Sequence, residues 1–203
     1  MALIFDELDL VDIETAINAG GRIWYNTTLD RLKGKIKDFY TSNDTSKCCY
    51  CAKLFQGEFR LVIDIEHVLP QAHFASERFV VQNLNVACKR CNMLIKKDDL
   101  TFLFNPAIAN NYYDSSHYKL IHPNLDVYTD HLILNTFRNG DSILNKYVIK
   151  TIDKGLFTYQ YFQLQETEID TISKAQGIKE NRGLTDKIRG AIRIRLYQLL
   201  VKI

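Results

Sequence analysis

The chain has 203 residues, and its 26 Lys and Arg against 24 Asp and Glu give a formal net charge of +2. So small a net charge does not by itself indicate a nucleic-acid-binding protein. No apolar run approaches the ~18 residues of a membrane span, and the acidic segment 5–9 is unlike a signal peptide, so we expect a cytoplasmic protein without membrane contact.

Two amphipathic helices are predicted before the first cysteine. The first covers residues 10–18 and stops at Gly20-Gly21, because glycine favours the end of a helix. The second covers residues 29–40 and follows an N-cap at Thr27 or Thr28. Basic residues surround the apolar stripe of this second helix.

Four cysteines form two pairs of equal spacing, Cys48-x2-Cys51 and Cys88-x2-Cys91. Each spacing lets two thiolates reach one metal ion, and two such pairs complete a tetrahedral site without an open position. We therefore predict a structural zinc ion that stabilises the fold and takes no part in catalysis. The alternative is that the pairs are buried or disulfide-bonded. Cys49 has a poor chelate spacing and is expected to be a small core residue or an idle thiol.

The 36 residues between the two cysteine pairs exceed the length of a plain zinc ribbon, so a further structure is expected there. Residues 60–65 are rich in β-branched side chains and predict a strand, with Glu66 and His67 at its end. Pro70 stops regular pairing because it lacks a backbone N–H. Residues from Asn92 onward predict the opening of a helix. We expect the zinc ion to pin both ends of this segment so that its polar residues meet.

These polar residues suit phosphodiester hydrolysis, which needs a base for water and a cation for the developing negative charge. A histidine side chain ordinarily titrates near neutral pH and can take that proton, so His67 is the candidate base. Glu66 and Asn92 offer a carboxylate and an amide oxygen, which suit a catalytic Mg²⁺ or Mn²⁺ ion. Asn83 is expected to orient the base through hydrogen bonds across the loop. Asp64, on the same strand face as Glu66, is the alternative ligand or a supporting partner.

The motifs Glu66-His67-x2-Pro70, Asn83-Leu84 and Cys88-x2-Cys91-Asn92 resemble the HNH endonuclease family over about residues 47–100. The resemblance implies an α+β fold with a zinc-stapled ββα-metal core. It also implies that His67 is the general base, that Glu66 and Asn92 bind the catalytic metal, and that the four cysteines bind zinc. Glu66 departs from the more usual Asp, and Asn92 stands where the family more often has His. Both substitutes keep an oxygen ligand.

Basic residues suggest where nucleic acid would bind. Lys89, Arg90, Lys96 and Lys97 flank the expected metal site and are predicted to contact backbone phosphates. The segment 174–203 has eight basic residues against two acidic ones, and its apolar residues recur at helical spacing. The basic side chains fit either a solvated helix face or phosphate contact. For the aromatic pair Trp24-Tyr25, packing in the core is favoured over stacking on bases.

Downstream of residue 105 the pattern changes to one that predicts a small antiparallel sheet followed by the basic helix. Strands are expected over 131–136, 143–152 and 156–165, with a hairpin turn at Asp153-Lys154-Gly155. Three regions are thus expected: an N-terminal helical segment 1–46, a nuclease core 47–104, and an α+β extension 105–203 packed on that core.

Residues 121–126 with Asp130-His131 are loosely similar to a segment that follows the HNH core in some prokaryotic defence nucleases, as in Septu-type and retron-associated systems. Those nucleases work beside an ATPase subunit, so the similarity implies such a partner; a homodimer is the other expectation. His122, Asp126 and His131 offer ligands for a second metal ion, although turn and surface roles are favoured for residues so widely spaced.

Together these features predict a metal-dependent HNH-type endonuclease that hydrolyses DNA, with restriction or anti-phage defence as its setting. One alternative is a catalytically silent zinc module that binds nucleic acid or a protein partner. Another is an RNase or tRNA-directed toxin with the same core, because metal and base act on the phosphodiester whichever sugar carries it.

Overall fold

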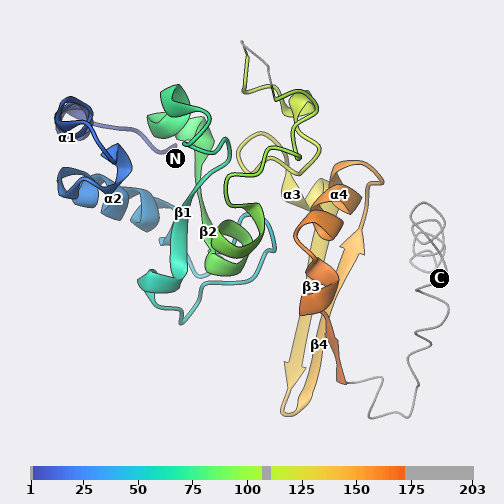
Figure 1. The fold of residues 1–203 in the computed structure, drawn as a ribbon. Coiled ribbons are helices and arrows are strands. Elements are labelled where there is room, and N and C mark those ends of the chain that lie inside the picture. The colour runs from blue at the N-terminus through green and yellow to red at the C-terminus, as the bar shows by residue number, and fades with distance from the viewer. Residues whose placement is uncertain (1, 107–110, 172–203) are drawn as a thin grey trace. The chain divides into compact units, whose positions relative to one another are not determined.

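The computed structural model describes residues 2–106 and 111–171, and it is a mixture of helices and small antiparallel sheets (Figure 1). The expected α+β class is therefore confirmed. The chain divides into two compact units, Met1–Leu100 and Thr101–Ile203. The expected segments 1–46 and 47–104 fall almost wholly in the first unit. The predicted basic helix over 174–203 lies outside the described residues.

Helices α1 (Glu7–Ala19) and α2 (Asp30–Thr41) open the first unit. A capping box starts α1, since the side chains of Asp6 and Asp9 each accept a hydrogen bond from the other's backbone N–H. Gly20, with φ of 68°, ends it as predicted. The N-cap expected at Thr27 or Thr28 is wrong: the Asn26 side chain accepts from the Thr28 N–H at 3.0 Å, which begins a 3₁₀ turn that runs into α2.

The predicted apolar stripe of α2 forms the core of this unit. Leu29, Leu32 and Ile36 are fully buried and pack in one cluster with Ile13 of α1 and with Leu84. Burying a side chain of this size stabilises the fold by about 1.5–3 kcal/mol. The helix is thereby fixed against the strands that carry the polar residues.

Strands β1 (Ile63–His67) and β2 (Leu84–Cys88) pair antiparallel beside α2, with Ile63 opposite Cys88 and His67 opposite Leu84 (Figure 1). A π-helical segment, Arg90–Lys96, follows β2. β1 begins three residues later than predicted, because Arg60–Val62 forms a 3₁₀ turn. Glu66 and His67 end β1, as the sequence indicated.

The second unit contains the sheet β3-β4-β5, formed by β3 (Leu132–Asn139), β4 (Ser142–Ile149) and β5 (Ile169–Asp170), with helices α3 (Tyr128–His131) and α4 (Lys154–Tyr161). Two of the expected strands are thus present. The two-residue turn between β3 and β4 lies at Gly140-Asp141, where Gly140 has φ of 56°.

The strand predicted over 156–165 and its turn at Asp153-Lys154-Gly155 are wrong, because α4 occupies this stretch. The Asp153 side chain accepts a hydrogen bond from the Lys154 N–H and so caps the helix. Gly155 then lies against the His131 backbone, where a Cβ would stand 2.3 Å from the carbonyl oxygen. Tertiary packing has overridden the β propensity of this segment.

Short 3₁₀ helices connect the main elements: Ile23–Tyr25, Thr27–Leu29, Arg60–Val62, Ala75–Phe79, Val81–Asn83, Ser115–His117 and Leu164–Thr167.

Candidate metal centre and adjoining groove

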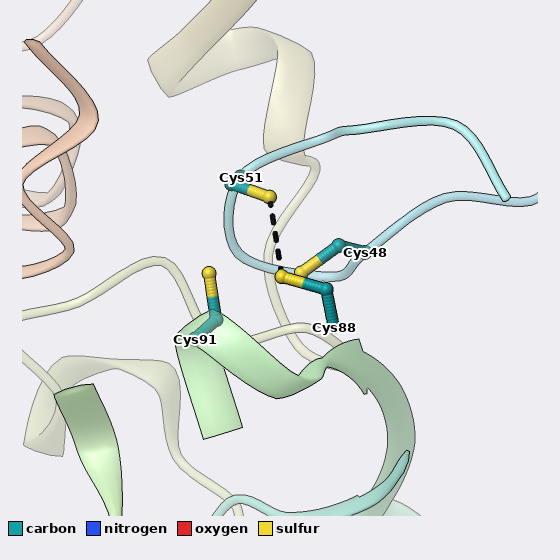
Figure 2. A group of neighbouring side chains, drawn as sticks. All are labelled: Cys48, Cys51, Cys88 and Cys91. Carbon is teal, nitrogen blue, oxygen red and sulfur yellow. Dashed lines mark hydrogen bonds between the residues drawn. The ribbon is translucent and has the colours of Figure 1, made fainter. Parts of the chain in front are cut away.

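The four predicted zinc ligands meet at one point (Figure 2). The Sγ atoms of Cys48, Cys51, Cys88 and Cys91 all lie within 4.8 Å of one another. Cys51 and Cys88 Sγ are 3.8 Å apart. Four Zn–S bonds of about 2.3 Å in a tetrahedron place sulfur atoms about 3.8 Å apart. The cluster is therefore positioned to bind a metal ion such as zinc.

Backbone hydrogen bonds shape the first cysteine pair for this role. The Cys48 N–H donates to the Lys53 carbonyl at 2.9 Å, and the Ala52 N–H donates to the Cys48 carbonyl at 2.9 Å. Ala52 has φ of 56°, which closes the turn. Cys49 is not one of the clustered thiols; burial and the adjacent Cys48 raise the pKa of its thiol, so it stays protonated.

A groove of about 840 Å³ opens beside the hairpin, and Asp64, His67 and Asn92 line it together. Its other wall comes from Trp24 and α2. The volume is that of cavities that hold small ligands. One groove thus collects a carboxylate, an imidazole and an amide.

Asp64 is the carboxylate beside Asn92. The Asn92 Nδ2 atom lies 3.4 Å from Asp64 Oδ2, and Lys89 Nζ lies 2.8 Å from Asp64 Oδ1. Asn92 also takes part in the π-helical geometry, since its carbonyl accepts from the Lys97 N–H at 2.8 Å. A π-bulge commonly marks a functional position in a helix.

Glu66, the expected metal ligand, is not brought into this groove with Asp64, His67 and Asn92. Its side chain is fully buried, and Oε1 accepts from Tyr50 Oη at 2.9 Å and from Lys96 Nζ at 2.8 Å. Burial raises the pKa of Glu66, and the ammonium of Lys96 opposes that effect. The alternative ligand, Asp64, is the carboxylate that reaches the groove.

Lys96 is likewise withdrawn from the predicted nucleic-acid contact, because its side chain is 1 % exposed and ion-paired with Glu66. Its Nζ also donates to the His67 carbonyl at 2.9 Å. This buried pair joins the helical segment to β1. Removing one partner of such a pair strongly destabilises the folded protein, because the other charge is left buried alone. Lys96 therefore supports the hairpin from inside the unit.

The remaining predicted basic contacts differ in position. Lys89 and Lys97 both line the groove, Lys97 with an exposed side chain. Arg90 is half-buried at the start of the helical segment. Phosphate contact by these three residues stays a prediction.

His67 lies in the groove wall with 8 % of its surface exposed. Its Nε2 is 3.0 Å from the Arg78 carbonyl, and a carbonyl accepts only, so Nε2 carries the proton and Nδ1 keeps the lone pair. The ring meets Trp24 edge-on, with centroids 4.4 Å apart. Burial lowers the pKa of His67 to about 4, so the imidazole is neutral near pH 7.

Asn83 makes hydrogen bonds across the loop between the two strands. Its Oδ1 accepts from the Leu69 N–H at 2.7 Å, and its Nδ2 donates to the carbonyls of Leu69 and Glu77 at 3.1 and 2.9 Å. Glu77 precedes Arg78, whose carbonyl holds His67. Asn83 thus braces the loop that positions the imidazole, while its effect on activity stays a prediction.

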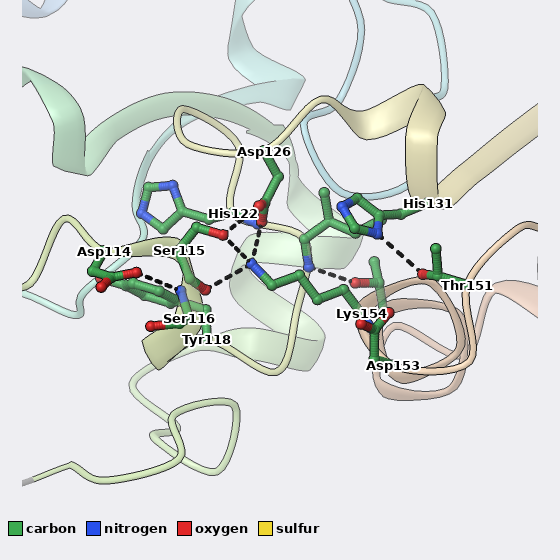
Figure 3. Close-up of polar contacts among 12 residues, drawn as sticks. Asp114, Ser115, Ser116, Tyr118, His122, Asp126, His131, Thr151, Asp153 and Lys154 are labelled. Carbon is green, nitrogen blue, oxygen red and sulfur yellow. Dashed lines mark hydrogen bonds and ion pairs between the residues drawn. The ribbon is translucent and has the colours of Figure 1, made fainter.

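The second unit holds a separate polar network (Figure 3). Lys154 Nζ donates to Asp126 Oδ2 and to Ser115 Oγ at 2.6 Å each. His131 instead contacts Thr151 through Nδ1 at 3.0 Å. Within the described residues the only cluster of metal-ligating side chains is the cysteine one, so the second metal site suggested by His122, Asp126 and His131 is not formed.

Sequence reasoning missed the contribution of the N-terminal segment to this groove. Trp24 packs against the apolar cluster as predicted, whereas Tyr25 is exposed. Trp24 also contacts His67, and Lys33 and Lys37 of α2 line the same cavity. A signal was present in the helical spacing, since Lys33 and Lys37 are four residues apart and share a face. The spacing alone did not indicate that this face of the helix would line the groove beside β1.

Comparison with known proteins identifies no relative: no protein-family model, curated protein or solved structure matches this chain. In the part of the chain that the structure describes, no helix has the length and apolar character needed to cross a membrane.

Proposed function

We propose that the chain is a metal-dependent endonuclease of the HNH type that hydrolyses DNA phosphodiesters in the groove of Asp64, His67 and Asn92. The observation that carries this proposal is the convergence of these three side chains in one cavity beside a hairpin whose end is tied to a four-cysteine cluster. The resemblance of the sequence motifs to that family supports the same conclusion.

In this proposal His67 is the general base. Its Nδ1 accepts a proton from water, whose oxygen then bonds to phosphorus while one P–O ester bond breaks and the leaving oxygen is protonated by solvent. The Arg78 carbonyl fixes the tautomer that leaves Nδ1 basic. Trp24 restricts the ring from the other side. The imidazole is thus held in one orientation, which a general base requires.

Asp64 and Asn92 would hold a catalytic Mg²⁺ or Mn²⁺ ion, because both offer oxygen ligands and face the same groove. Such an ion neutralises negative charge on the phosphoryl oxygens when bound. The four cysteines would hold zinc as a structural ion, since four thiolates leave no open position. Asp64 replaces Glu66 in this assignment because the Glu66 carboxylate is buried against Lys96.

One contact favours the alternative of a silent binding module. Lys89 already pairs with Asp64 at 2.8 Å, so a divalent ion has to displace an ammonium group. The Lys89 side chain is 43 % exposed, however, and that of Asp64 is 18 % exposed, so solvent reaches the pair; surface ion pairs stabilise by about 1 kcal/mol or less. Lys89 can therefore turn outward to a phosphate when a metal ion takes its place.

A cleavage panel tests the proposal. Zinc-loaded protein is incubated with supercoiled plasmid and, in parallel, with single-stranded and structured RNA, each with Mg²⁺, with Mn²⁺ or without added metal. We expect metal-dependent nicking of the plasmid. Metal-dependent cleavage of RNA alone would reassign the substrate, and retention of DNA without cleavage under any condition would favour the silent module.

A further inference from the structure

The four cations of α2 divide into two sets that face different partners. Arg31 and Lys35 face the carboxylates of α1: Arg31 lies 2.9 Å from Asp12, and Lys35 lies 2.7 Å from Asp6. Lys33 and Lys37 instead line the groove that contains Asp64 and His67. Only the second set is placed to meet a substrate in that groove.

Lys37 differs in its partner from three other cations that line the groove. Lys33 pairs with Asp30, Arg60 with Asp38, and Lys89 with Asp64. Lys37 Nζ donates to the Arg60 carbonyl at 3.1 Å, and among the described residues no carboxylate lies within ion-pair distance of it. Of the groove cations Lys33, Lys37, Arg60 and Lys89, it is the one whose charge no contacting carboxylate compensates.

The surroundings of Lys37 raise the free energy of that uncompensated charge. The side chain is half-buried, and Arg60 and Lys89 stand near it with like charge. Burial lowers the pKa of Lys37, Asp64 opposes this, and the two neighbouring cations add to it. A phosphate in the groove would accept a charge-assisted hydrogen bond from the Lys37 ammonium. That bond would offset both the lost hydration of the ammonium and its repulsion by Arg60 and Lys89.

The groove offers room for part of a nucleic-acid backbone. Its volume of about 840 Å³ is that of sites for small ligands, so in the proposed complex a short stretch of one backbone strand would lie in it. Lys37 of α2 and Lys97, which follows the helical segment, both line the groove and would then be available to that strand.

We propose that Lys37 binds a backbone phosphate of the strand that enters this groove and thereby positions the phosphodiester over Asp64 and His67. This inference rests on the proposed function and adds a substrate-positioning residue from outside the hairpin. Phosphate binding by Lys37 can be tested independently of cleavage, because the contact forms without any reaction.

The test measures the salt dependence of DNA binding by Lys37→Gln. Fluorescence anisotropy of a labelled duplex is followed over a series of salt concentrations, with zinc-loaded protein and no added Mg²⁺ or Mn²⁺. Each phosphate contact contributes about 0.9 to the slope of log K against log salt. Lys37→Gln should therefore lower the magnitude of the slope by about 0.9 and weaken binding at low salt.

Lys35→Gln is the matched control, since it removes the same charge from the same helix on the side that faces α1. Zinc content and circular dichroism establish that both variants are folded. A reduced slope for Lys37→Gln alone supports the inference even if the protein cleaves nothing. Equal slopes for wild type and Lys37→Gln, or equal losses in both variants, overturn it, and they do so even if the wild type is an active nuclease.

Discussion

Two carboxylates of β1 stand two residues apart and have opposite environments. Asp64 faces the groove beside Asn92, whereas Glu66 is fully buried with Tyr50 and Lys96. The proposed ion needs an accessible oxygen, and the buried pair needs both charges. One strand therefore carries a functional carboxylate and a structural one.

We expect Asp64→Asn to lose metal-dependent cleavage by at least about 100-fold while it keeps its fold, because it removes a charged ligand of the proposed ion. Glu66→Gln should instead lower the free energy of unfolding by about 3–5 kcal/mol, because Lys96 is left buried without its carboxylate. Urea unfolding and plasmid nicking, measured on both variants, separate the two effects. The reverse result would restore Glu66 as the ligand.

The buried imidazole of His67 makes stability depend on pH. Its pKa falls from 6.5 to about 4 in the folded protein because burial disfavours the charged ring. Between these values the unfolded chain binds more protons than the folded one, so stability is complete above 6.5 and declines as pH falls toward 4. The full difference corresponds to about 3 kcal/mol.

We expect the wild type to lose about 2 kcal/mol more than His67→Gln between about pH 7 and pH 5, measured by urea unfolding. The cysteine cluster also responds to acid, but it does so in both proteins and cancels in the comparison. Equal losses would show that His67 is already protonated or solvent-exposed in the folded state.

At the scale of elements, the cysteine cluster ties the turn at Cys48–Cys51 to the end of β2 and to the helical segment that follows. Metal binding at such a site couples directly to folding, with apparent energies on the order of 10 kcal/mol. The groove residue Asn92 lies on the joined helical segment, and Asp64 lies on β1, which pairs with β2.

We expect Cys88→Ser to lose bound zinc and the folded structure together. Cys49→Ser is the matched control, since Cys49 lies next to Cys48 and outside the clustered thiols. Zinc content by atomic absorption and secondary structure by circular dichroism report the two properties. If Cys88→Ser kept both zinc and fold, the cluster would not be the structural site.

Much of the first unit could be predicted because its signals are local. The cysteine spacing, the apolar stripe of α2 and the β-branched run before Glu66 all led to the elements observed. The burial of Glu66 could not be predicted, because alternation along a strand shows which residues share a face, and not which of them is buried. That outcome depends on Tyr50 and Lys96, which are distant in sequence from the strand.

In the second unit, local sequence signals predicted one element wrongly. Its segment 154–161 has aromatic and β-branched residues that favour a strand, yet it is helical because Asp153 caps it and Gly155 packs against His131. The observed turn at Gly140-Asp141 has a hairpin signal of the same kind as Asp153-Lys154-Gly155, where the turn was predicted. Competing turn signals of similar strength are resolved by packing, which the sequence does not display.

At the scale of the whole molecule, the net charge is small, but the basic residues differ in whether nearby carboxylates neutralise them. Arg31 and Lys35 are neutralised by the carboxylates of α1, while Lys37, Lys89 and Lys97 line the groove. A net charge of +2 therefore conceals a basic groove wall. One groove that admits a single strand also predicts nicking by each active site. The proposed setting in defence, beside an ATPase subunit or as a homodimer, stays a prediction.

The most direct test of the account is plasmid nicking by His67→Ala, with protein in excess over supercoiled plasmid and Mg²⁺ or Mn²⁺ present. His73→Ala is the matched control, because His73 is exposed in the loop that follows Pro70. With zinc content and fold intact in both, we predict that His67→Ala slows nicking by about 100-fold or more and that His73→Ala cuts as the wild type does. Nicking by His67→Ala at the wild-type rate, or no metal-dependent nicking by folded wild type, would contradict the assignment of this groove as a hydrolytic site for DNA.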